Sequence, residues 1–167
     1  MILEIIKIEN PILRIKSQEI SKDFPELKEI LTNMKDTLEQ GGVGLAAPQI
    51  GLSIRIFIVD LECEGITLKQ TFINPKIIEK KGLMLKDYEG CLSIPKINDL
   101  VPRPDMIRIK YLDENFDEHD EIYNGLEARV IQHEYDHLEG ILFIDRLPKE
   151  KQLLIKVSLE IEKRKNK

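Results

Sequence analysis

Two of the three histidines in this chain lie four residues apart, in the segment His133-Glu134-Tyr135-Asp136-His137. On an α-helix this spacing places both imidazoles on one face, within reach of a single metal ion. Glu134 would project beside them, where a carboxylate can hold a water molecule and take its proton. The pattern H-E-x-x-H therefore predicts a metal-dependent hydrolase, although a surface helix could carry these residues by chance.

The sequence around this motif is typical of a helix. Asn124-Gly125 provides a turn before it, and Gly140 suits a C-terminal stop. Between these limits apolar residues recur at helical spacing, at positions 126, 130, 131 and 138. We therefore expect one regular helix to position both histidines.

A catalytic metal site needs a further protein ligand, which can be a carboxylate, a histidine or a cysteine. His119 lies in an acidic segment that we predict to be a solvated loop, so we expect it at the surface. Cys63 lies between two glutamates, which disfavour a thiolate. Cys91 follows a glycine that permits close backbone approach, but on its own it indicates only a buried free cysteine. These residue types leave the third ligand open.

Residues 41–51 combine glycines with small apolar residues and include Gln49 near their end. The stretch lacks the Gly-Lys-Ser/Thr ending of a phosphate-binding loop, and it follows a predicted helix rather than a strand. Small residues allow a substrate backbone to come near, and Gln49 offers an uncharged amide donor. A tight loop of packing residues is the simpler alternative.

Composition narrows the setting of this chemistry. The 167 residues fit one domain, and 42% of them are hydrophobic. No apolar run approaches the length that crosses a membrane, and the first residues carry an acid too early for a secretory signal. Two cysteines do not suggest a disulfide scaffold, so we expect a protein of the reducing cytoplasm.

The net charge of −5 is unevenly distributed. Between Lys149 and Lys167 there are seven basic and three acidic residues, so this tail carries +4 while the rest of the chain carries −9. A solvated basic end is the simpler interpretation, and contact with an anionic partner such as RNA is the more specific one. We do not predict direct binding of DNA.

Helices are predicted near both ends of the chain. The first covers residues 25–40, with Asp23 as its cap, an apolar stripe at helical spacing and Gly41-Gly42 at its end. The last is an amphipathic helix over the tail from Pro148 to Lys167, with apolar residues at positions 154, 157 and 161.

Predicted strands cluster in the middle of the chain. We expect strands at residues 55–61, 66–78 and 106–112, a loop at 113–121, and a short strand at 141–144 after the H-E-x-x-H helix. Because the strands are grouped and the helices lie at the start and end, the pattern favours an α+β fold over alternating α/β units.

Three motifs together resemble the signature motifs of peptide deformylases. They are Gly-Val-Gly-Leu-Ala-Ala-Pro-Gln at 42–49, Glu-Gly-Cys-Leu-Ser at 89–93 and Gln-His-Glu-Tyr-Asp-His at 132–137, in this order and at fitting separations. Similarity extends from residues 11–14 to 140–143 and beyond, so it covers nearly the whole chain. The resemblance implies one catalytic domain over residues 1–167, with mixed or antiparallel β-sheets packed around a central H-E-x-x-H helix.

The resemblance also implies a reaction. Peptide deformylases remove the formyl group from the N-terminal formyl-methionine of nascent bacterial proteins and release formate. By this resemblance Cys91, His133 and His137 would bind the metal, with water in the fourth position, and Glu134 would move the water's proton to the departing amine. Iron(II) is the usual metal of the family, while zinc, nickel and cobalt also suit thiolate and imidazole ligands.

Further roles carry over from the matching positions. The side-chain amide of Gln49 and the backbone N–H of Leu92 would donate to the oxyanion, and Gly44 would let the substrate backbone approach. The methionine pocket would be lined by Val43, Leu126 and Val130, for each of which ordinary core packing is the alternative.

Arg103 and Asp136 are expected to pair beside the ligand His137.

Two positions depart from the family pattern. Asn98 replaces an arginine that in many members helps to hold the peptide, and Arg129 stands where some relatives are aliphatic. We expect Arg129 to face solvent or to extend along the pocket rim.

Two other classes of protein remain as alternatives. A metallopeptidase that cuts internal bonds would need a different third ligand, and the motif around Cys91 disfavours it. A metal-binding module without activity would be expected to lack Glu134, which is present. Because family members meet nascent chains at the ribosome, the basic tail is a candidate for ribosome docking.

Overall fold

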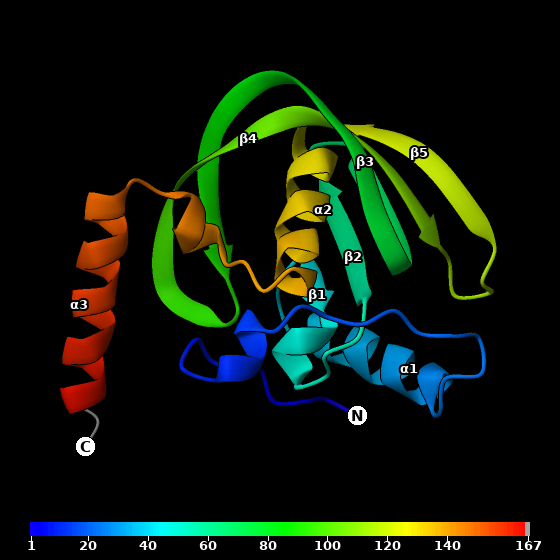
Figure 1. The fold of residues 1–167 in the computed structure, drawn as a ribbon, viewed down its shortest axis with the longest axis horizontal. Helices are drawn as coiled ribbons and strands as arrows, with labels where there is room; N and C mark the ends of the chain where they lie inside the picture. The colour runs from blue at the N-terminus through cyan, green and yellow to red at the C-terminus, as the bar shows by residue number, and fades with distance from the viewer. Residues whose placement is uncertain (166–167) are drawn as a thin grey trace.

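The computed structural model describes residues 1–165, so the last two residues of the predicted basic tail lie outside the described part. Its β-structure is one antiparallel sheet in which neighbours in sequence are neighbours in space, in the order β1-β2-β3-β4-β5 (Figure 1). The strands are β1 (Gly44–Ala46), β2 (Ile56–Cys63), β3 (Ile66–Cys91), β4 (Ile94–Leu112) and β5 (Glu118–Asn124). The α-helices are α1 (Leu27–Leu38), α2 (Gly125–Leu138) and α3 (Lys149–Lys165). The predicted α+β class is confirmed.

A tight turn sets the register between β2 and β3. Glu64 and Gly65 have φ angles of 49° and 82°, and Cys63 pairs with Ile66 across them. Positive φ at both central residues is the geometry of the two-residue hairpin turn whose twist matches that of the flanking strands. Glu64 and Gly65 therefore form the tight turn that joins the two predicted strands.

Strands β3 and β4 are much longer than the sequence indicated. Their pairing is interrupted by four register shifts, between Ile73 and Cys91 on the β3 side. Such bulges bend a strand and increase its twist, and the two strands arch over α2 in Figure 1. Most residues from 79 to 88 are exposed, so this part of the hairpin lacks the alternating pattern that burial of one face produces.

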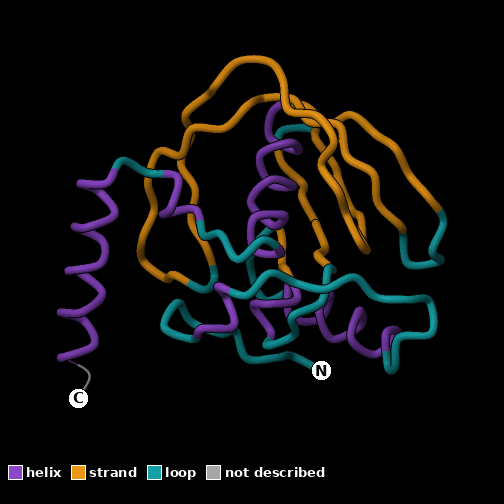
Figure 2. The backbone as a smooth tube through the Cα atoms, in the orientation of Figure 1, coloured by secondary structure: helices purple, strands orange, loops and turns teal. Residues whose placement is uncertain are grey.

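The sheet is covered on both faces, because α1 and α2 pack on opposite sides of β2. Phe57, Val59 and Leu61 point into a core shared with α2, whereas Ile56 and Ile58 point into a core shared with α1. A strand buried on both faces has a continuous apolar sequence rather than an alternating one, as β2 does. Figure 2 shows α2 enclosed by strands as a result.

Three local predictions were wrong. Helix α1 begins at Leu27 after Glu26, whose φ is 59°, and no side chain caps it, so Asp23 is not its cap. Residues 141–144 form no strand, since a 3-10 helix occupies Phe143–Arg146 and its apolar residues pack against Leu13 and Ile94. A short apolar run satisfies either structure. The predicted loop at 113–121 ends at Glu118, where β5 begins and pairs with β4.

His119 lies at the surface as expected, but on a strand rather than in a loop. It lies on β5, half-buried, with its ring stacked on Tyr111 at a centroid distance of 4.9 Å. Its Nε2 lies 3.0 Å from Asp113 Oδ2, and that hydrogen bond raises the pKa of the imidazole. His119 therefore has a structural environment of its own on the outer strand.

The tail forms the predicted amphipathic helix, α3, which lies at one side of the molecule in Figure 1 and is joined to β4 by ion pairs of Lys151 with Asp99 and of Glu162 with Lys96. None of its residues is buried, and its large apolar side chains are exposed at Leu153, Leu154, Val157 and Ile161. Within residues 1–165, no helix combines the length and apolar character needed to span a membrane.

Phe72 occupies the centre of the core beneath α2. Its ring is fully buried, stacks on Phe57 at a centroid distance of 4.5 Å and packs at a tilt against Tyr111 at 4.3 Å. Phe72→Ala should lower the free energy of unfolding by about 3–5 kcal/mol, because it removes buried apolar surface and leaves a cavity. Urea unfolding followed by circular dichroism measures the change.

The matched control is Ile122→Ala, since Ile122 is 58% exposed on β5. Its unfolding free energy should stay within about 0.5 kcal/mol of the wild-type value. Equal losses in the two variants would contradict the placement of the core.

Candidate active site

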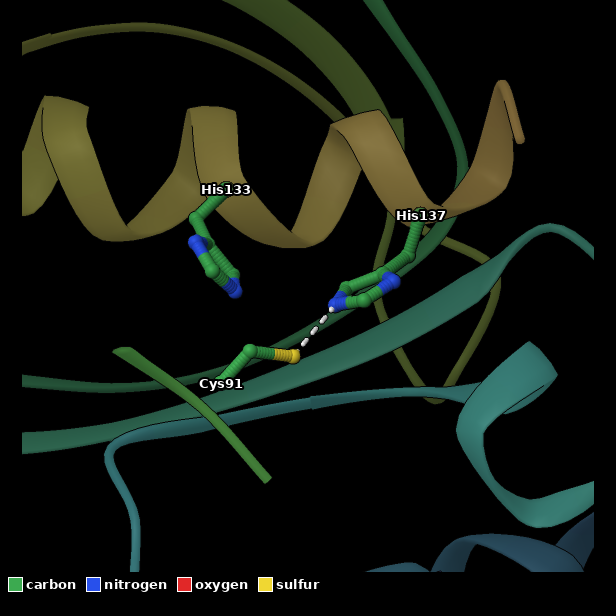
Figure 3. A group of neighbouring side chains, drawn as sticks. All are labelled: Cys91, His133 and His137. Atoms are coloured by element: carbon green, nitrogen blue, oxygen red, sulfur yellow. Dashed lines mark hydrogen bonds between the residues drawn. The ribbon is translucent and has the colours of Figure 1, made fainter. Parts of the chain in front are cut away.

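Three potential metal ligands meet between α2 and the end of β3. Sγ of Cys91 and one ring nitrogen from each of His133 and His137 lie within 4.8 Å of one another. In Figure 3 the two imidazoles descend from consecutive turns of α2 and face the thiol. The structure thus brings together the three residues that the resemblance implied.

Backbone geometry explains how residues so far apart in sequence meet. The four-residue spacing of the histidines puts them on one face of α2, as the sequence predicted. Cys91 is the last residue of β3, and it pairs with Ile94 at the tight turn into β4. A register shift just before it, at Gly90, breaks the regular ladder where the thiol must turn towards the helix.

The donor set fits a divalent metal ion. His137 Nε2 lies 3.3 Å from Cys91 Sγ. A tetrahedral ion with usual bond lengths of about 2.3 Å to sulfur and 2.1 Å to nitrogen separates such ligands by about 3.6 Å. Burial holds the pKa of His137 well below its usual value, so this imidazole is neutral, as a metal ligand must be.

His133 and Cys91 interact strongly. Burial opposes protonation of His133, but hydrogen bonding with Cys91 and Glu89 outweighs it and raises the pKa of the imidazole to about 10. The imidazole of His133 is therefore protonated at neutral pH and places a positive charge beside the Cys91 thiol. A divalent cation can replace that charge, with both residues deprotonated.

Glu89 orients His133 from outside the ligand group. Its Oε2 lies 2.9 Å from His133 Nδ1, which leaves Nε2 free to face the metal position. The carboxylate also accepts hydrogen bonds from Arg103, at 2.6 and 2.9 Å, and from Arg129, at 2.7 Å. Burial would raise the pKa of Glu89, but the bonds from Arg103 and His133 outweigh it and lower the pKa to about 2.

Arg103 joins this carboxylate to a second one on α2. It is 2% exposed, and its Nη1 donates to Asp136 at 2.8 Å. Arg146 donates two further bonds to Asp136, both of 2.5 Å. The structure therefore places Asp136 and Arg103 in contact beside the ligand helix, with Arg146 as a partner that the sequence did not indicate.

Glu134 lines the same cavity as Cys91 and His133 without being fully bonded. Its side chain is buried, and Oε2 has no hydrogen-bond partner in the part of the chain that the structure describes. Burial raises the pKa of this carboxyl to about 7. A Cβ at Gly44 would lie 2.6 Å from Oε1, so only glycine fits beside the glutamate. An unsatisfied carboxylate oxygen there can accept a proton from a bound water.

Gln49 is held with its amide nitrogen towards the thiol. It lies in the 3-10 helix Ala47–Ile50, and its Oε1 accepts a bond of 2.9 Å from the backbone N–H of Ala46. Its Nε2 lies 3.5 Å from Cys91 Sγ and 3.3 Å from Ser93 Oγ. The oxygen is thus committed to the backbone, and the donor end faces the site.

A cavity of about 390 Å³ opens beside these groups. The predicted pocket residues line it, and among them Val43 is exposed and Val130 is buried. Gln49, Cys91, Leu92, His133 and Glu134 line it as well. The structure therefore gathers the expected pocket residues and the chemical groups around one opening.

Arg129 does not behave as expected, because it neither faces solvent nor extends along the rim. It is buried, and besides Glu89 it donates to the backbone oxygens of Val101 and Leu85, both at 2.8 Å.

Asn98 is exposed on β4 opposite Gly90, and a Cβ at that glycine would lie 2.3 Å from Asn98 Oδ1.

Comparison with known proteins agrees with this geometry. A family model described as polypeptide deformylase matches residues 2–153. The peptide deformylase of Christiangramia forsetii is 49% identical over 173 residues, covering 95% of this chain and 88% of that protein. The chain belongs to the polypeptide deformylase family. It is accordingly a metal-dependent hydrolase that removes the N-formyl group from nascent polypeptides.

Solved structures support the assignment of the deformylase fold. The crystal structure of peptide deformylase from Ehrlichia chaffeensis matches with a TM-score of 0.91 and 30% identity, covering 99% of each chain. A class I type b peptide deformylase from Acinetobacter baumannii, bound to Met-Ala-Ser, matches with a TM-score of 0.82 and 32% identity, covering 88% of this chain and 99% of that one.

Sequence reasoning missed Glu89 as a functional residue of this deformylase. A signal was present, because Glu89 lies two residues before Cys91 within the quoted motif, and an acidic residue can orient a histidine ligand. What the sequence did not contain was the register that turns this carboxylate towards α2.

Glu89→Gln should weaken metal binding by about 10–100-fold, because the amide cannot accept all the bonds from His133 and the two arginines. Competition with a chromophoric chelator measures the dissociation constant. Glu79→Gln is the matched control, since Glu79 lies on the same strand and pairs with Lys81 near the surface. Unchanged affinity in Glu89→Gln would show that the carboxylate does not support the ligand.

Proposed function

We propose that Cys91, His133 and His137 hold one divalent ion, and that Glu134, Gln49 and Leu92 carry out the deformylation. The observation that supports this most strongly is the meeting of three metal-binding side chains with the unpaired carboxylate oxygen of Glu134. The substrate is an N-formyl-methionyl peptide, and the products are formate and a free N-terminal amine.

When bound, the ion supplies a Lewis acid that polarises the formyl carbonyl and lowers the pKa of water from about 15.7 towards ~7. We propose iron(II) as the physiological ion, with zinc, nickel or cobalt as substitutes. One thiolate and two imidazoles suit all of these metals, so metal analysis of protein purified without oxygen decides between them.

Glu134 is the proposed proton carrier. Its buried carboxylate accepts a proton from the attacking water, and the same proton passes to the amine as the carbon–nitrogen bond breaks. A carboxyl with a pKa near 7 can both accept and release a proton at neutral pH. Gly44 keeps the carboxylate accessible, since a side chain there would overlap it.

Gln49 and the backbone N–H of Leu92 are the proposed donors to the formyl oxygen as negative charge develops on it. Both residues line the cavity, and the amide group of Gln49 is fixed by its bond from Ala46. A fixed donor of this kind typically contributes ~3–4 kcal/mol to the stability of the transition state.

The methionine side chain of the substrate is proposed to enter the cavity between Val43, Leu126 and Val130. These apolar residues line the same cavity as Gly44, where the peptide backbone can approach closely. The Acinetobacter relative bound to Met-Ala-Ser is a deformylase with the same fold, which is consistent with a peptide site here.

Glu134→Gln should reduce formate release from a formyl-methionyl peptide by about a hundredfold to ten-thousandfold, because an amide cannot carry the proton. Its metal content should equal that of the wild type, since Glu134 is not a proposed ligand. Formate is measured with a coupled dehydrogenase assay, and metal by atomic spectroscopy.

Glu127→Gln is the matched control, a glutamate in the first turn of the same helix and absent from the cavity. It should release formate at nearly the wild-type rate. Activity retained in Glu134→Gln would contradict the proposed proton carrier, whereas a wild-type protein inactive with every metal would contradict the function itself.

We also propose that residues 1–167 form one catalytic domain of the cytoplasm and that α3 docks on the ribosome. The last turn of α3 carries Lys163, Arg164 and Lys165, and no residue of the helix is buried in the protein. A basic, exposed helix of this kind can bind the phosphates of ribosomal RNA.

A truncation that ends at Pro148 should lose co-sedimentation with ribosomes and keep formate release from a short peptide. A second variant of the full chain, Lys163→Glu with Arg164→Glu and Lys165→Glu, keeps the helix and reverses the charge of its last turn. It should likewise lose co-sedimentation. If both proteins still co-sediment at moderate salt, α3 is not the docking element.

A further inference from the structure

Two cavities lie on either side of one pair of side chains. The active-site cavity of about 390 Å³ and a second cavity of about 250 Å³ share Leu126 and Arg129. Besides these two, the second cavity is lined by residues of β3, of β4 and of the start of α2, namely Leu85, Lys86, Asp87, Pro104, Asp105 and Gly125. Leu126 and Arg129 therefore separate the proposed methionine pocket from a further space.

Helix geometry makes these two residues neighbours. They are three positions apart in α2, and such side chains lie next to each other on a helix face. The fourth position after Leu126 is Val130, which lines only the active-site cavity. The separating wall therefore consists of one apolar side chain and the stem of one arginine.

Arg129 is held in place by its head group. Nη1 donates to Glu89 and to the backbone oxygen of Val101, and Nη2 donates to the backbone oxygen of Leu85. Moving the guanidinium would leave a buried carboxylate and two backbone oxygens short of a donor. An aliphatic residue in the same place would have no such anchor and could change rotamer to admit a longer ligand.

We propose that Arg129, together with Leu126, sets the depth of the substrate side-chain pocket and excludes first residues longer than methionine. This inference rests on the proposed function, because it takes the active-site cavity as the side-chain pocket. Arg129 is thereby a specificity-determining residue that makes the end of the pocket rigid. Its hydrogen bond to Glu89 also links this wall to the carboxylate that orients His133.

The test compares two formyl peptides that differ only in their first residue. One carries norleucine, which resembles methionine in length, and the other carries aminooctanoic acid, whose side chain is two methylenes longer. The quantity measured is the ratio of kcat/KM for the long substrate to that for the norleucine substrate. The ratio cancels a general loss of activity that affects both substrates equally.

Arg129→Ala and Leu126→Ala should each raise this ratio by about tenfold or more, because either change opens the wall, and each methylene accommodated in an apolar pocket typically changes the rate by that order. Leu126→Ala breaks no side-chain hydrogen bond, so it tests the wall even if Arg129→Ala fails to fold. Arg129→Met restores a side chain of similar length without the guanidinium, and its ratio should be well below that of Arg129→Ala.

Arg108→Ala is the control for loss of an arginine–carboxylate pair, since Arg108 bonds to Asp120 on the exposed side of β4. Its ratio should equal that of the wild type. Unchanged ratios in Leu126→Ala and in any folded Arg129→Ala would overturn the inference. If the wild type releases no formate even from the norleucine peptide, the proposed function fails, and this inference fails with it.

Discussion

The carboxylate of Glu89 is the group on which the site depends. It is buried, and it is bonded by Arg103, Arg129 and the metal-facing histidine His133. Burying so many charges is unfavourable unless each has a partner, and here every charged donor meets a carboxylate oxygen. Removing this single carboxylate would leave Arg129 without its carboxylate partner, Arg103 with Asp136 alone, and the imidazole of His133 without orientation. Glu89 thus links the stability of the hairpin to the geometry of the metal ligands.

The long hairpin of β3 and β4 brings that carboxylate and Cys91 to α2. Glu89 and Cys91 lie at the end of β3, Arg103 lies on β4, and both histidines lie on the helix beneath. A flat pair of strands would pass over the helix without surrounding it, whereas the bulges bend β3 and β4 around it. The curvature of β3 and β4 therefore brings both the ion-pair network and Cys91 to the histidines of α2.

The parts of this structure that follow local rules were predictable from sequence. The H-E-x-x-H helix has helical periodicity, and β2 has a continuous apolar run. The third ligand was not predictable from residue type, because Cys91 and Cys63 differ only in context, and the resemblance of motifs was needed to choose. The position of Arg129 was missed because its partners Glu89 and Val101 lie on strands whose register has no local signal.

Glu89 and Glu134 show how one scaffold assigns opposite states to two carboxylates. Both are buried, but Glu89 meets several cationic donors and has a pKa of about 2, whereas Oε2 of Glu134 has no partner in the described chain and its pKa is about 7. An unsatisfied buried oxygen typically costs about 1–3 kcal/mol. The bonds around Glu89 offset such a cost, and Gly44 leaves space for the oxygen to remain open. Hydrogen bonds are therefore concentrated on Glu89, whereas within residues 1–165 Oε2 of Glu134 is left unpaired beside the cavity.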